Sequence, residues 1–572
     1  MLKITVIDMI KTARTQLLPI ICCITASLVL GFAPFFYGRQ QTGDWSAPNQ
    51  LEIDYYLQIA ARPYFDHVPY LTDPSVPDGP ILFPWLQYIP AVYFAREFGL
   101  NVFSLTVGWT LFASVAMAGA LYGLFRYFLR WRWLAGGLTI IFLADSSGTD
   151  YHPFVRQIGI LLAALINPAQ SIDLELFQYR LVNPAVVFPF IFLHILAVAA
   201  ARNRSNRLRT WISGATFALL CYVYFYAWTM VAAALCLAFL IDNRARGLYA
   251  KTLAIGFAAG APLIVHDTLV QRAFSREAEA RFGLFAAPRG WPESYYPLHH
   301  YDMILIPCLF GGLIAWLLVS RNYQMIYLWC LAVAGFVLSF SSWVTGVYLH
   351  DYHWQWLARP MLAVLLCMVA ATVVTGRLRL SPALTRVWSI AVVLFFLTGL
   401  YVSTLGLRTD PDLRAQLRGY AQYKAQRLEG NAAALDPGAM IGGDDRFCDL
   451  AVAGEGVRDL AGWTLYVSMA VDNTELYARY GLNQYLAGVT DRNQFKATFA
   501  AALRLVPRDE ELEQFVRVFD EVSNDPRKFL DAYHVRYAAL RTDQPTPSYL
   551  KDGWILVQHG PYWQIWQRTA AN

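Results

Sequence analysis

Residues 50–67 read QLEIDYYLQIAARPYFDH and lie directly after the first long apolar segment of the chain, near residues 17–37. What this acidic, tyrosine-rich stretch can do depends on the side of a membrane that it occupies. The whole chain has 572 residues, of which 56% are hydrophobic and only 15% are charged. Such a composition is typical of a protein with many membrane-spanning segments.

Long apolar runs continue to about residue 407, and the remainder is charged and ordinary in composition. We therefore predict a polytopic α-helical membrane domain over residues 1–407 and a soluble domain over residues 408–572. A run over residues 211–241 is too long for one span, which predicts a tight helical hairpin turning near Tyr222–Trp228. About eleven spans are expected, near residues 17–37, 102–125, 133–144, 183–201, 211–226, 227–241, 249–265, 303–319, 325–341, 360–375 and 388–405.

The short loops between these segments show where the basic residues gather. Alternate loops are basic, whereas the others are longer and rich in aromatic and acidic residues. By the positive-inside rule, this pattern predicts a cytoplasmic N-terminus and an external C-terminal domain. No small-residue cleavage site follows the first segment (FFYGRQQ), so we expect it to be retained as an anchor. Residues 50–67 would then lie at the external membrane surface.

The quoted stretch has the periodicity of a short amphipathic helix. Polar residues recur at Asp54, Gln58 and Arg62, and Pro63 is expected to end the helix. We therefore predict a helix lying in the membrane interface. Its apolar stripe would consist of Ile53, Tyr56, Leu57, Ala60 and Ala61.

Asp54 would sit in the first turn of that helix, where the helix dipole favours an ionised carboxylate. A carboxylate held there could act as general base for an acceptor hydroxyl. The plainer interpretation is a solvated residue at a helix start, and position alone does not decide between them.

The layout resembles the GT-C superfamily of integral-membrane glycosyltransferases, which use polyprenyl-phosphate-linked sugars. The resemblance rests on the long first external loop and on Asp54-Tyr55-Tyr56 within it, although here Glu52 precedes the acid instead of a second acid following it. It implies a GT-C-like fold, a catalytic Asp54, and a substrate-binding role for Tyr56 beside it.

The second external loop holds further polar residues, in LADSSGTDYHPFVRQ. In GT-C proteins a second acidic site often positions the acceptor or binds a divalent metal, which makes Asp145 and Asp150 catalytic candidates and His152 a binding candidate. These side chains could hold a divalent cation (Mg or Mn), although their spacing is not specific for one. A polar turn loop is the alternative, and we assign no residue as a metal ligand.

Two arginines are candidates for binding a lipid phosphate. Arg180 lies in FQYRLVNPAVVFPF, and Arg359 follows His353 in the predicted loop YLHDYHWQWLARPM, just before the tenth span. A guanidinium presents a planar fork that suits phosphate oxygens. The GT-C resemblance implies a phosphate-binding role for basic residues of such late loops, with His353 beside Arg359; the alternative for either arginine is an interfacial residue with no ligand.

The C-terminal domain reads as a small α/β or α+β domain. We predict a juxtamembrane helix over 410–430, strands in GAMIGG, GWTLYVS, AYHVRYAALRT, GWILVQHG and YWQIWQRT, and helices in ELYARYGLNQYLAGV and DEELEQFVRVFDEVSN. Its GGDDRF segment lacks the glycine spacing of a nucleotide-binding loop. We expect no nucleic-acid partner, because the basic residues lie in short loops rather than in one patch.

Three functions are consistent with these patterns. The first is a glycosyltransferase of the bacterial inner membrane, which moves a sugar from a polyprenyl-phosphate donor to a glycan, lipid or protein acceptor of the cell envelope. The second is a multi-span lipid or solute transporter or flippase, although no internal repeat is evident. The third is an O-antigen ligase or polymerase-like enzyme, which relies on arginines and a histidine rather than on a first-loop acid.

Overall fold

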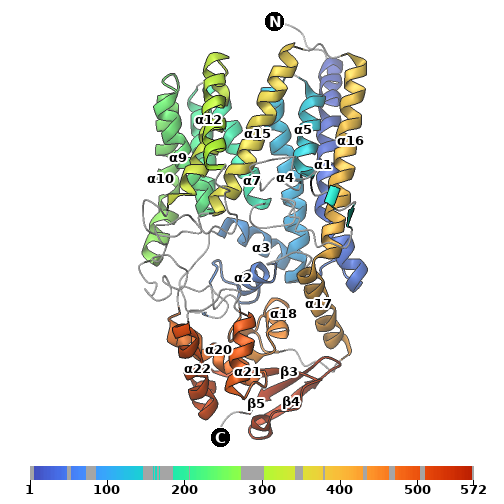
Figure 1. The fold of residues 1–572 in the computed structure, drawn as a ribbon, viewed down its shortest axis with the longest axis vertical. Helices are drawn as coiled ribbons and strands as arrows, with labels where there is room; N and C mark the ends of the chain where they lie inside the picture. Colours follow the sequence, from blue (N-terminus) through green and yellow to red (C-terminus); the bar gives the residue numbers. More distant parts are fainter. Residues whose placement is uncertain are drawn as a thin grey trace. The chain divides into compact units, whose positions relative to one another are not determined.

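The computed structural model describes residues 6–47, 53–72, 76, 85–129, 131–145, 185–204, 206–271, 302–341, 352–377, 381–429, 435–462, 471–502 and 509–569, with isolated residues between 159 and 167. They form two compact units (Figure 1). The first takes its residues from 1–37, 107–266 and 283–411, and the second from 38–106, 267–282 and 412–572. The predicted domain boundary between residues 407 and 408 stays a prediction.

The first unit is built from long helices that run side by side (Figure 1). Within it α5 packs against α15 and α16, and α13 packs against α9 and α15. Its helices are α1 (Val6–Thr42), α4 (Leu105–Phe128), α5 (Arg132–Ala144), α7 (Val187–Asn203), α8 (Arg207–Cys221), α9 (Phe225–Ile241), α10 (Arg246–Gln271), α12 (Asp302–Val319), α13 (Ile326–Leu338), α15 (Tyr352–Arg377) and α16 (Pro382–Thr409), with a 3₁₀ turn at Tyr323–Met325.

Five helices in the described part of the chain are long and apolar enough to cross a membrane. They lie within α1, α4, α10, α15 and α16, at Leu17–Thr42, Val102–Phe128, Arg246–His266, His353–Thr375 and Pro382–Thr409. The protein is therefore a multi-span membrane protein. Each predicted span overlaps a helix, but several of these helices are shorter than an untilted span. The count of eleven stays a prediction.

The sequence explains why these helices form and where they break. Helix α9 contains no charged residue and is uniformly apolar, so no face of it prefers water. The chain leaves α8 after Cys221 and re-enters a helix at Phe225, which confirms the predicted hairpin. The break occupies 222–224, at the start of the predicted turn.

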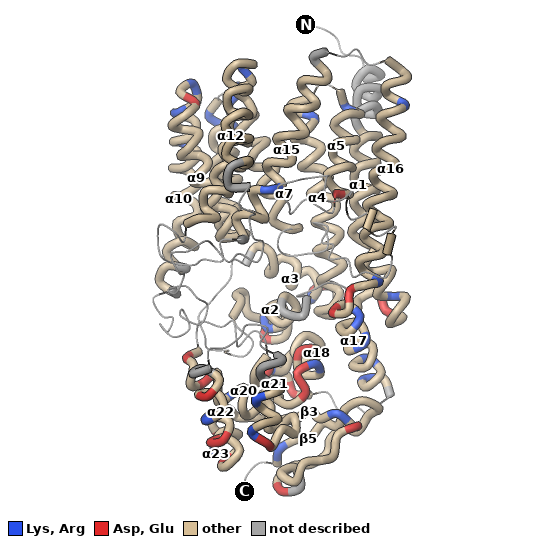
Figure 2. The backbone as a smooth tube through the Cα atoms, viewed as in Figure 1, with Lys and Arg blue, Asp and Glu red and all other residues tan. Residues whose placement is uncertain are grey.

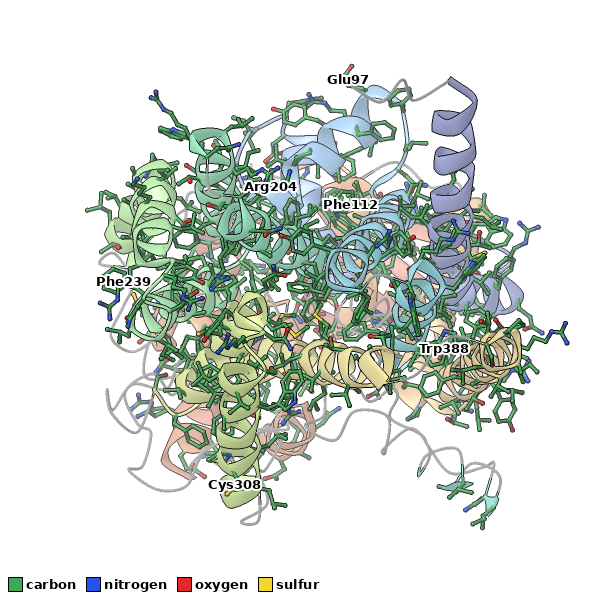
Figure 3. The ribbon with its side chains drawn as sticks, turned by 90° about the horizontal axis from the view of Figure 1, so that it is seen from above. Glu97, Phe112, Arg204, Phe239, Cys308 and Trp388 are labelled. Atoms are coloured by element: carbon green, nitrogen blue, oxygen red, sulfur yellow. The ribbon has the colours of Figure 1, made fainter. Side chains whose placement is uncertain are left out.

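The outer surface of the first unit is apolar. Figure 2 shows few charged residues along its helices and many more in the second unit. Exposed side chains on its helices include Phe112, Phe239 and Cys308 (Figure 3), as expected of helices that face lipid. Arg202 and Asp242 form an ion pair inside this unit: Arg202 Nε lies 2.6 Å from Asp242 Oδ2, and both side chains are largely buried.

The second unit combines helices with one sheet. Its helices are α2 (Ile53–Phe65), α3 (Ile89–Glu97), α17 (Pro411–Glu429), α18 (Asp445–Glu455), α20 (Asn473–Leu486), α21 (Arg492–Ala502), α22 (Asp509–Asn524) and α23 (Pro526–Ala532), with 3₁₀ turns at Trp85–Gln87, Val102–Ser104 and Ser548–Lys551. Its strands are β1 (Met440–Gly443), β2 (Arg458–Asp459), β3 (Val535–Arg541), β4 (Trp554–His559) and β5 (Trp563–Arg568).

The sheet is mixed, with the order β2-β1-β3-β5-β4. Strand β1 pairs in parallel with β2 and β3, whereas β5 pairs antiparallel with β3 and β4. Gly443 ends β1 with a φ of 116°, and a Cβ there would overlap the backbone of Ala539 in β3. Only glycine permits that approach. The predicted α/β or α+β domain is thus confirmed as a helix-and-sheet unit.

Amphipathic helices cover this sheet. Phe515, Phe519 and Val522 of α22 recur at helical spacing and are buried, whereas Glu513 and Glu521 face solvent. Helices α20 and α22 pack together over a core that includes Leu482, Leu486 and Leu540. The predicted strand in residues 463–468 lies outside the described residues. The other predicted helices and strands of this part are confirmed.

Candidate substrate-binding site

Helix α15 carries two of the predicted binding residues, His353 and Arg359. The prediction of a loop up to the tenth span is wrong for residues 352–359, because α15 begins at Tyr352 and continues to Arg377. The helix starts early because Trp354, Trp356 and Leu357 are buried, and helix geometry gives them a packed face. His353 and Arg359 are therefore held by a helix inside the first unit.

Arg359 is buried in this helix and is only 5% exposed. Its Nη2 donates a hydrogen bond of 2.9 Å to Oε1 of Gln355, one turn earlier. It lies six residues into the candidate span His353–Thr375, or about 9 Å along the helix axis. A charged side chain at such a place is unfavourable unless it is neutralised, and such residues usually mark a ligand site. Arg359 can present a planar fork to an anionic group.

His353 is fixed by aromatic residues of α9. Its Nδ1 and the hydroxyl of Tyr224 share a hydrogen bond of 2.6 Å. The ring stacks on Tyr226, with centroids 4.5 Å apart and an interplanar angle of 17°. Trp354 Nε1 donates to Thr229 Oγ1 of α9 at 3.0 Å, which ties the two helices together again. This cluster sets the rotation of α15 and thus the direction of its polar residues.

Asp145 follows α5 as its C-terminal capping residue and is 1% exposed. The prediction placed it in an external loop, but its carboxyl group is inside the first unit. It interacts electrostatically with the thiol of Cys367, two turns beyond Arg359 in α15. Helices α5 and α15 pack together, so the structure brings Asp145 to the same helix that carries Arg359.

Helix α2 of the second unit carries Asp54 and Tyr56. The backbone at Asp54 is helical, and its side chain lies outside the described part of the structure. Tyr56 is buried, with its ring 6.5 Å from that of Tyr88. Pro63 does not end the helix, which runs two residues further to Phe65. A proline so near the end removes only one hydrogen bond of the helix.

The predicted polar face of α2 is wrong at Gln58, whereas the position of the helix in the membrane interface stays a prediction. Gln58, expected on the polar face, is 1% exposed, and the residues around it are buried too. Its Nε2 donates a hydrogen bond of 2.6 Å to Asp449 Oδ1 in α18. Gln58 therefore contacts the C-terminal part of the chain instead of water.

The other predicted residues, Asp150, His152 and Arg180, lie outside the described residues. Within the described part, no group of three or more His, Cys, Asp or Glu side chains is arranged to hold a metal ion. The divalent cation stays a prediction.

The structure also adds residues that the sequence interpretation missed. Gln355 precedes Arg359 by four residues, a spacing that places two side chains on one helix face and could have indicated the pair. Nothing in the sequence indicates that Tyr224 meets His353, because the two are 129 residues apart.

No model of a known protein family matches the chain, and no curated protein matches it. Solved structures do. The crystal structure of ArnT from Cupriavidus metallidurans bound to undecaprenyl phosphate is 11% identical, with a TM-score of 0.50 over 96% of this chain and 98% of ArnT. The chain shares the fold of ArnT. The archaeal oligosaccharyltransferase AglB from Archaeoglobus fulgidus, in complex with an inhibitory peptide and a dolichol-phosphate, is 9% identical, with a TM-score of 0.42 over 91% of this chain and 69% of AglB.

This fold match agrees with the resemblance that the sequence suggested, and it extends over nearly the full length of both chains. At this identity the likeness concerns the fold alone. Roles of individual residues in this chain must be argued from its own side chains.

Proposed function

We propose that this protein is a polyprenyl-phosphate-dependent glycosyltransferase of the bacterial inner membrane. The observation that supports it most is the full-length fold match with ArnT, whose structure contains undecaprenyl phosphate. A lipid donor also fits a chain that holds a buried arginine in a membrane-spanning helix, because the phosphate of such a donor lies at the membrane boundary.

In this proposal Arg359 binds the phosphate of the donor, with Gln355 holding its guanidinium in place. Arg180, His353, His152 and Tyr56 are further substrate-binding residues of the proposal. A guanidinium neutralises the charge that grows on the phosphate oxygens as the bond to the sugar breaks. It therefore stabilises the leaving group.

Asp54 is proposed as the general base. It takes the proton of an acceptor hydroxyl while the hydroxyl oxygen bonds to the anomeric carbon. The polyprenyl phosphate leaves with the electron pair of the broken bond, so the configuration of the sugar inverts. Asp145 and Asp150 are proposed to position the acceptor, which is a glycan, lipid or protein of the cell envelope. The basic loops favour a cytoplasmic N-terminus and an external C-terminal part.

The test compares wild type with Asp54→Asn, purified in detergent and given polyprenyl-phosphate sugars with cell-envelope acceptors. We expect the variant to bind donor like wild type and to transfer sugar about 10²–10⁴-fold more slowly. Asp66→Asn is the control: Asp66 lies just after the same helix and pairs with Arg62 at 3.3 Å.

Full activity in Asp54→Asn would remove Asp54 as the base and point to Asp145 or Asp150. If the wild-type protein binds the lipid-linked sugar but never cleaves the sugar from its lipid phosphate, the transferase proposal is contradicted and a lipid transporter is favoured. Transfer that survives Asp54→Asn but is lost in His353→Ala would favour an enzyme of the ligase type.

A further inference from the structure

A polar hollow in the second unit is lined by none of the residues proposed above. It has a volume of about 450 Å³ and is bounded by one face of α17, the first turn of α18 and the end of β3. Its lining residues are Asp412, Ala415, Gln416, Arg418, Gly419, Gln422, Arg446 and Arg541. Pockets for small molecules usually measure about 300–1,000 Å³. The hollow is larger than a single inorganic anion needs.

The charge of this hollow is positive. Its lining contains three arginines, Arg418 of α17, Arg446 of α18 and Arg541 of β3, and one carboxyl group, that of Asp412. Arg541 is held in place, because its guanidinium lies 5.5 Å from the Trp563 ring centroid and Nε lies 3.7 Å from Asp543 Oδ1. Guanidinium groups converging from separate elements form a site for a phosphate or carboxylate group.

Gly419 of α17 lets the side chain of Arg446 lie close to that helix. A Cβ at Gly419 would overlap the side chain of Arg446. A glycine inside a helix is unfavourable by about 1 kcal/mol relative to alanine. Its presence in α17 allows Arg446 to lie against the helix and beside the hollow.

Gln416 provides an independent sign of a ligand. Its side chain is 94% buried, being 6% exposed, and it lines the hollow. Its Oε1 accepts no hydrogen bond from any residue that the structure describes. A buried amide oxygen without a donor is unfavourable by about 1–3 kcal/mol. A ligand hydroxyl in the hollow would supply the donor.

We propose that this hollow binds an acidic saccharide, with its phosphate or carboxylate group on the arginines and one of its hydroxyls on Gln416. The arginines alone would suit any anion, and the amide oxygen adds the requirement for a hydroxyl. The ligand can be soluble or the headgroup of a glycolipid, because α17 begins two residues after the last candidate span ends at Thr409. The site does not depend on the transferase proposal, since it contains none of its residues.

The experiment titrates the full-length protein in detergent with glucose 1-phosphate, glucuronate, glucose and sulfate, and reads binding by calorimetry. We expect both acidic sugars to bind at least about tenfold more tightly than glucose, since a hydrogen bond to a charged group contributes about 1.5–3 kcal/mol. Glucuronosyl diacylglycerol in the same detergent separates the two sources: tighter binding than glucuronate assigns the site to a glycolipid, and equal binding assigns it to a soluble ligand.

Three variants test the assignment of residues. Arg418→Ala removes an exposed arginine and should weaken the binding of both acidic sugars about tenfold or more. Gly419→Ala should displace Arg446 and weaken the binding of both acidic sugars as well. Gln416→Leu should weaken the binding of glucose 1-phosphate about threefold to tenfold and leave sulfate binding unchanged, because sulfate carries no hydroxyl and only the hydroxyl contact is lost.

Arg517→Ala is the matched control, since Arg517 is exposed on α22 and does not line the hollow. The proposal is overturned if Arg418→Ala and Gly419→Ala bind the acidic sugars like wild type, or if wild type binds none of them. Equal effects of Gln416→Leu on the binding of glucose 1-phosphate and of sulfate would overturn the hydroxyl contact. Sugar transfer is measured separately, so failure of the transferase proposal leaves these outcomes unaffected.

Discussion

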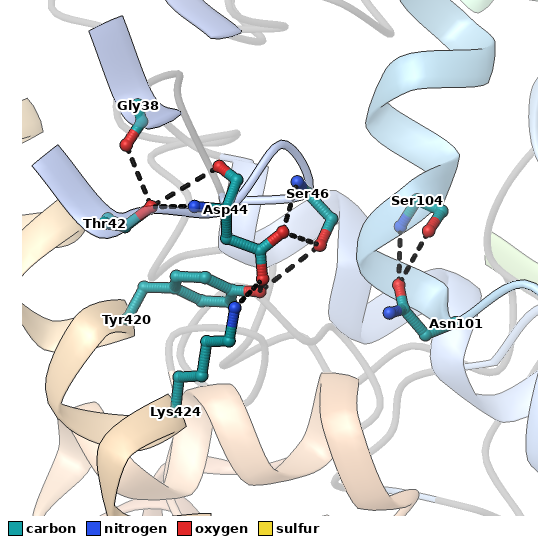
Figure 4. A network of polar contacts seen from close by, with 8 residues as sticks. All are labelled: Gly38, Thr42, Asp44, Ser46, Asn101, Ser104, Tyr420 and Lys424. Atoms are coloured by element: carbon teal, nitrogen blue, oxygen red, sulfur yellow. Dashed lines mark hydrogen bonds and ion pairs between the residues drawn. The ribbon is translucent and has the colours of Figure 1, made fainter. Parts of the chain in front are cut away.

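Lys424 of α17 forms an ion pair with Asp44, which lies 380 residues earlier in the chain, with Nζ and Oδ2 2.7 Å apart (Figure 4). The same carboxyl group accepts hydrogen bonds from the hydroxyl of Tyr420 at 3.1 Å and from the backbone and side chain of Ser46 at 3.0 Å. The residues that follow α1 are thereby bonded to α17, the helix that follows the last candidate span. This pairing holds the second unit together across most of the sequence.

The first prediction concerns acid stability at Asp44. Burial alone would raise its pKa, but the hydrogen bonds from Lys424, Ser46 and Tyr420 outweigh burial and lower the pKa from 3.8 to about 2. A lowered pKa means that the folded state favours the ionised form. The stabilisation is therefore complete above about pH 4 and is lost as the pH falls toward 2.

We expect Asp44→Asn to lower the free energy of unfolding by about 1 kcal/mol at pH 6, because the partly exposed pair is weakened by solvent. The difference from wild type should shrink below pH 4. Thermal unfolding in detergent between pH 6 and pH 3 measures this. A difference that stays constant over the whole range would show that the carboxylate charge is not responsible.

The second prediction concerns Gln58 in α2. Its hydrogen bond to Asp449 joins α2 to α18, and Gln58→Leu would remove a donor from a carboxylate in the interior of the second unit. We expect a loss of about 1–3 kcal/mol in the free energy of unfolding. Denaturant unfolding of Gln58→Leu, Asp449→Leu and the double variant measures the coupling. Gln494→Leu, on an exposed position of α21, is the control; strictly additive losses would contradict a direct interaction.

These contacts show which features the sequence could predict. The apolar run of α9 and the alternating strands of the sheet were evident, because burial imposes a periodicity that a single segment displays. The interior position of Gln58 was not evident, since a polar residue at helical spacing reads as solvent-exposed until its partner is known. The partner Asp449 is 391 residues away.

Helix ends were harder than helix interiors for the same physical reason. Pro63 and the polar letters HDYHWQWLAR both suggested breaks, yet α2 continues past the proline and α15 begins before Arg359. Tertiary packing of Trp354 and Leu357 stabilises the start of α15 more than local sequence disfavours it. Of the candidate site, the sequence could indicate Arg359, His353 and, through its helical spacing, the pair of Arg359 with Gln355, but not that Tyr224 binds His353.

The third prediction concerns the hydrogen bond between Tyr224 and His353. Tyr224→Phe and His353→Phe each remove one partner and keep an aromatic ring in the cluster. We expect each variant to lower the free energy of unfolding by about 1 kcal/mol, and the double variant to lower it by less than the sum. Thermal unfolding in detergent measures all three. Tyr222→Phe, in the same turn, is the control because its hydroxyl bonds to the backbone of Ala259 instead.

The fourth prediction separates binding from stability at Arg359. Arg359→Met replaces a buried charge with an apolar side chain of similar length but removes the donor to Gln355 Oε1, so we expect the free energy of unfolding to fall by no more than about 1–3 kcal/mol. Binding of a polyprenyl phosphate should weaken at least about tenfold, because a charge-assisted contact contributes about 1.5–3 kcal/mol. Arg359→Lys should recover only part of the binding, since a point charge replaces the planar fork.

Arg202→Met gives the opposite pattern and is the matched control. Its partner Asp242 would remain buried without its cation, so stability should fall by about 3–5 kcal/mol. The lipid affinity of the folded fraction should not change, because Arg202 has no part in the proposed site. Calorimetric titration with undecaprenyl phosphate and thermal unfolding of both variants give the comparison. If Arg359→Met binds the lipid like wild type while losing stability as Arg202→Met does, then Arg359 is a structural residue and the donor phosphate binds elsewhere.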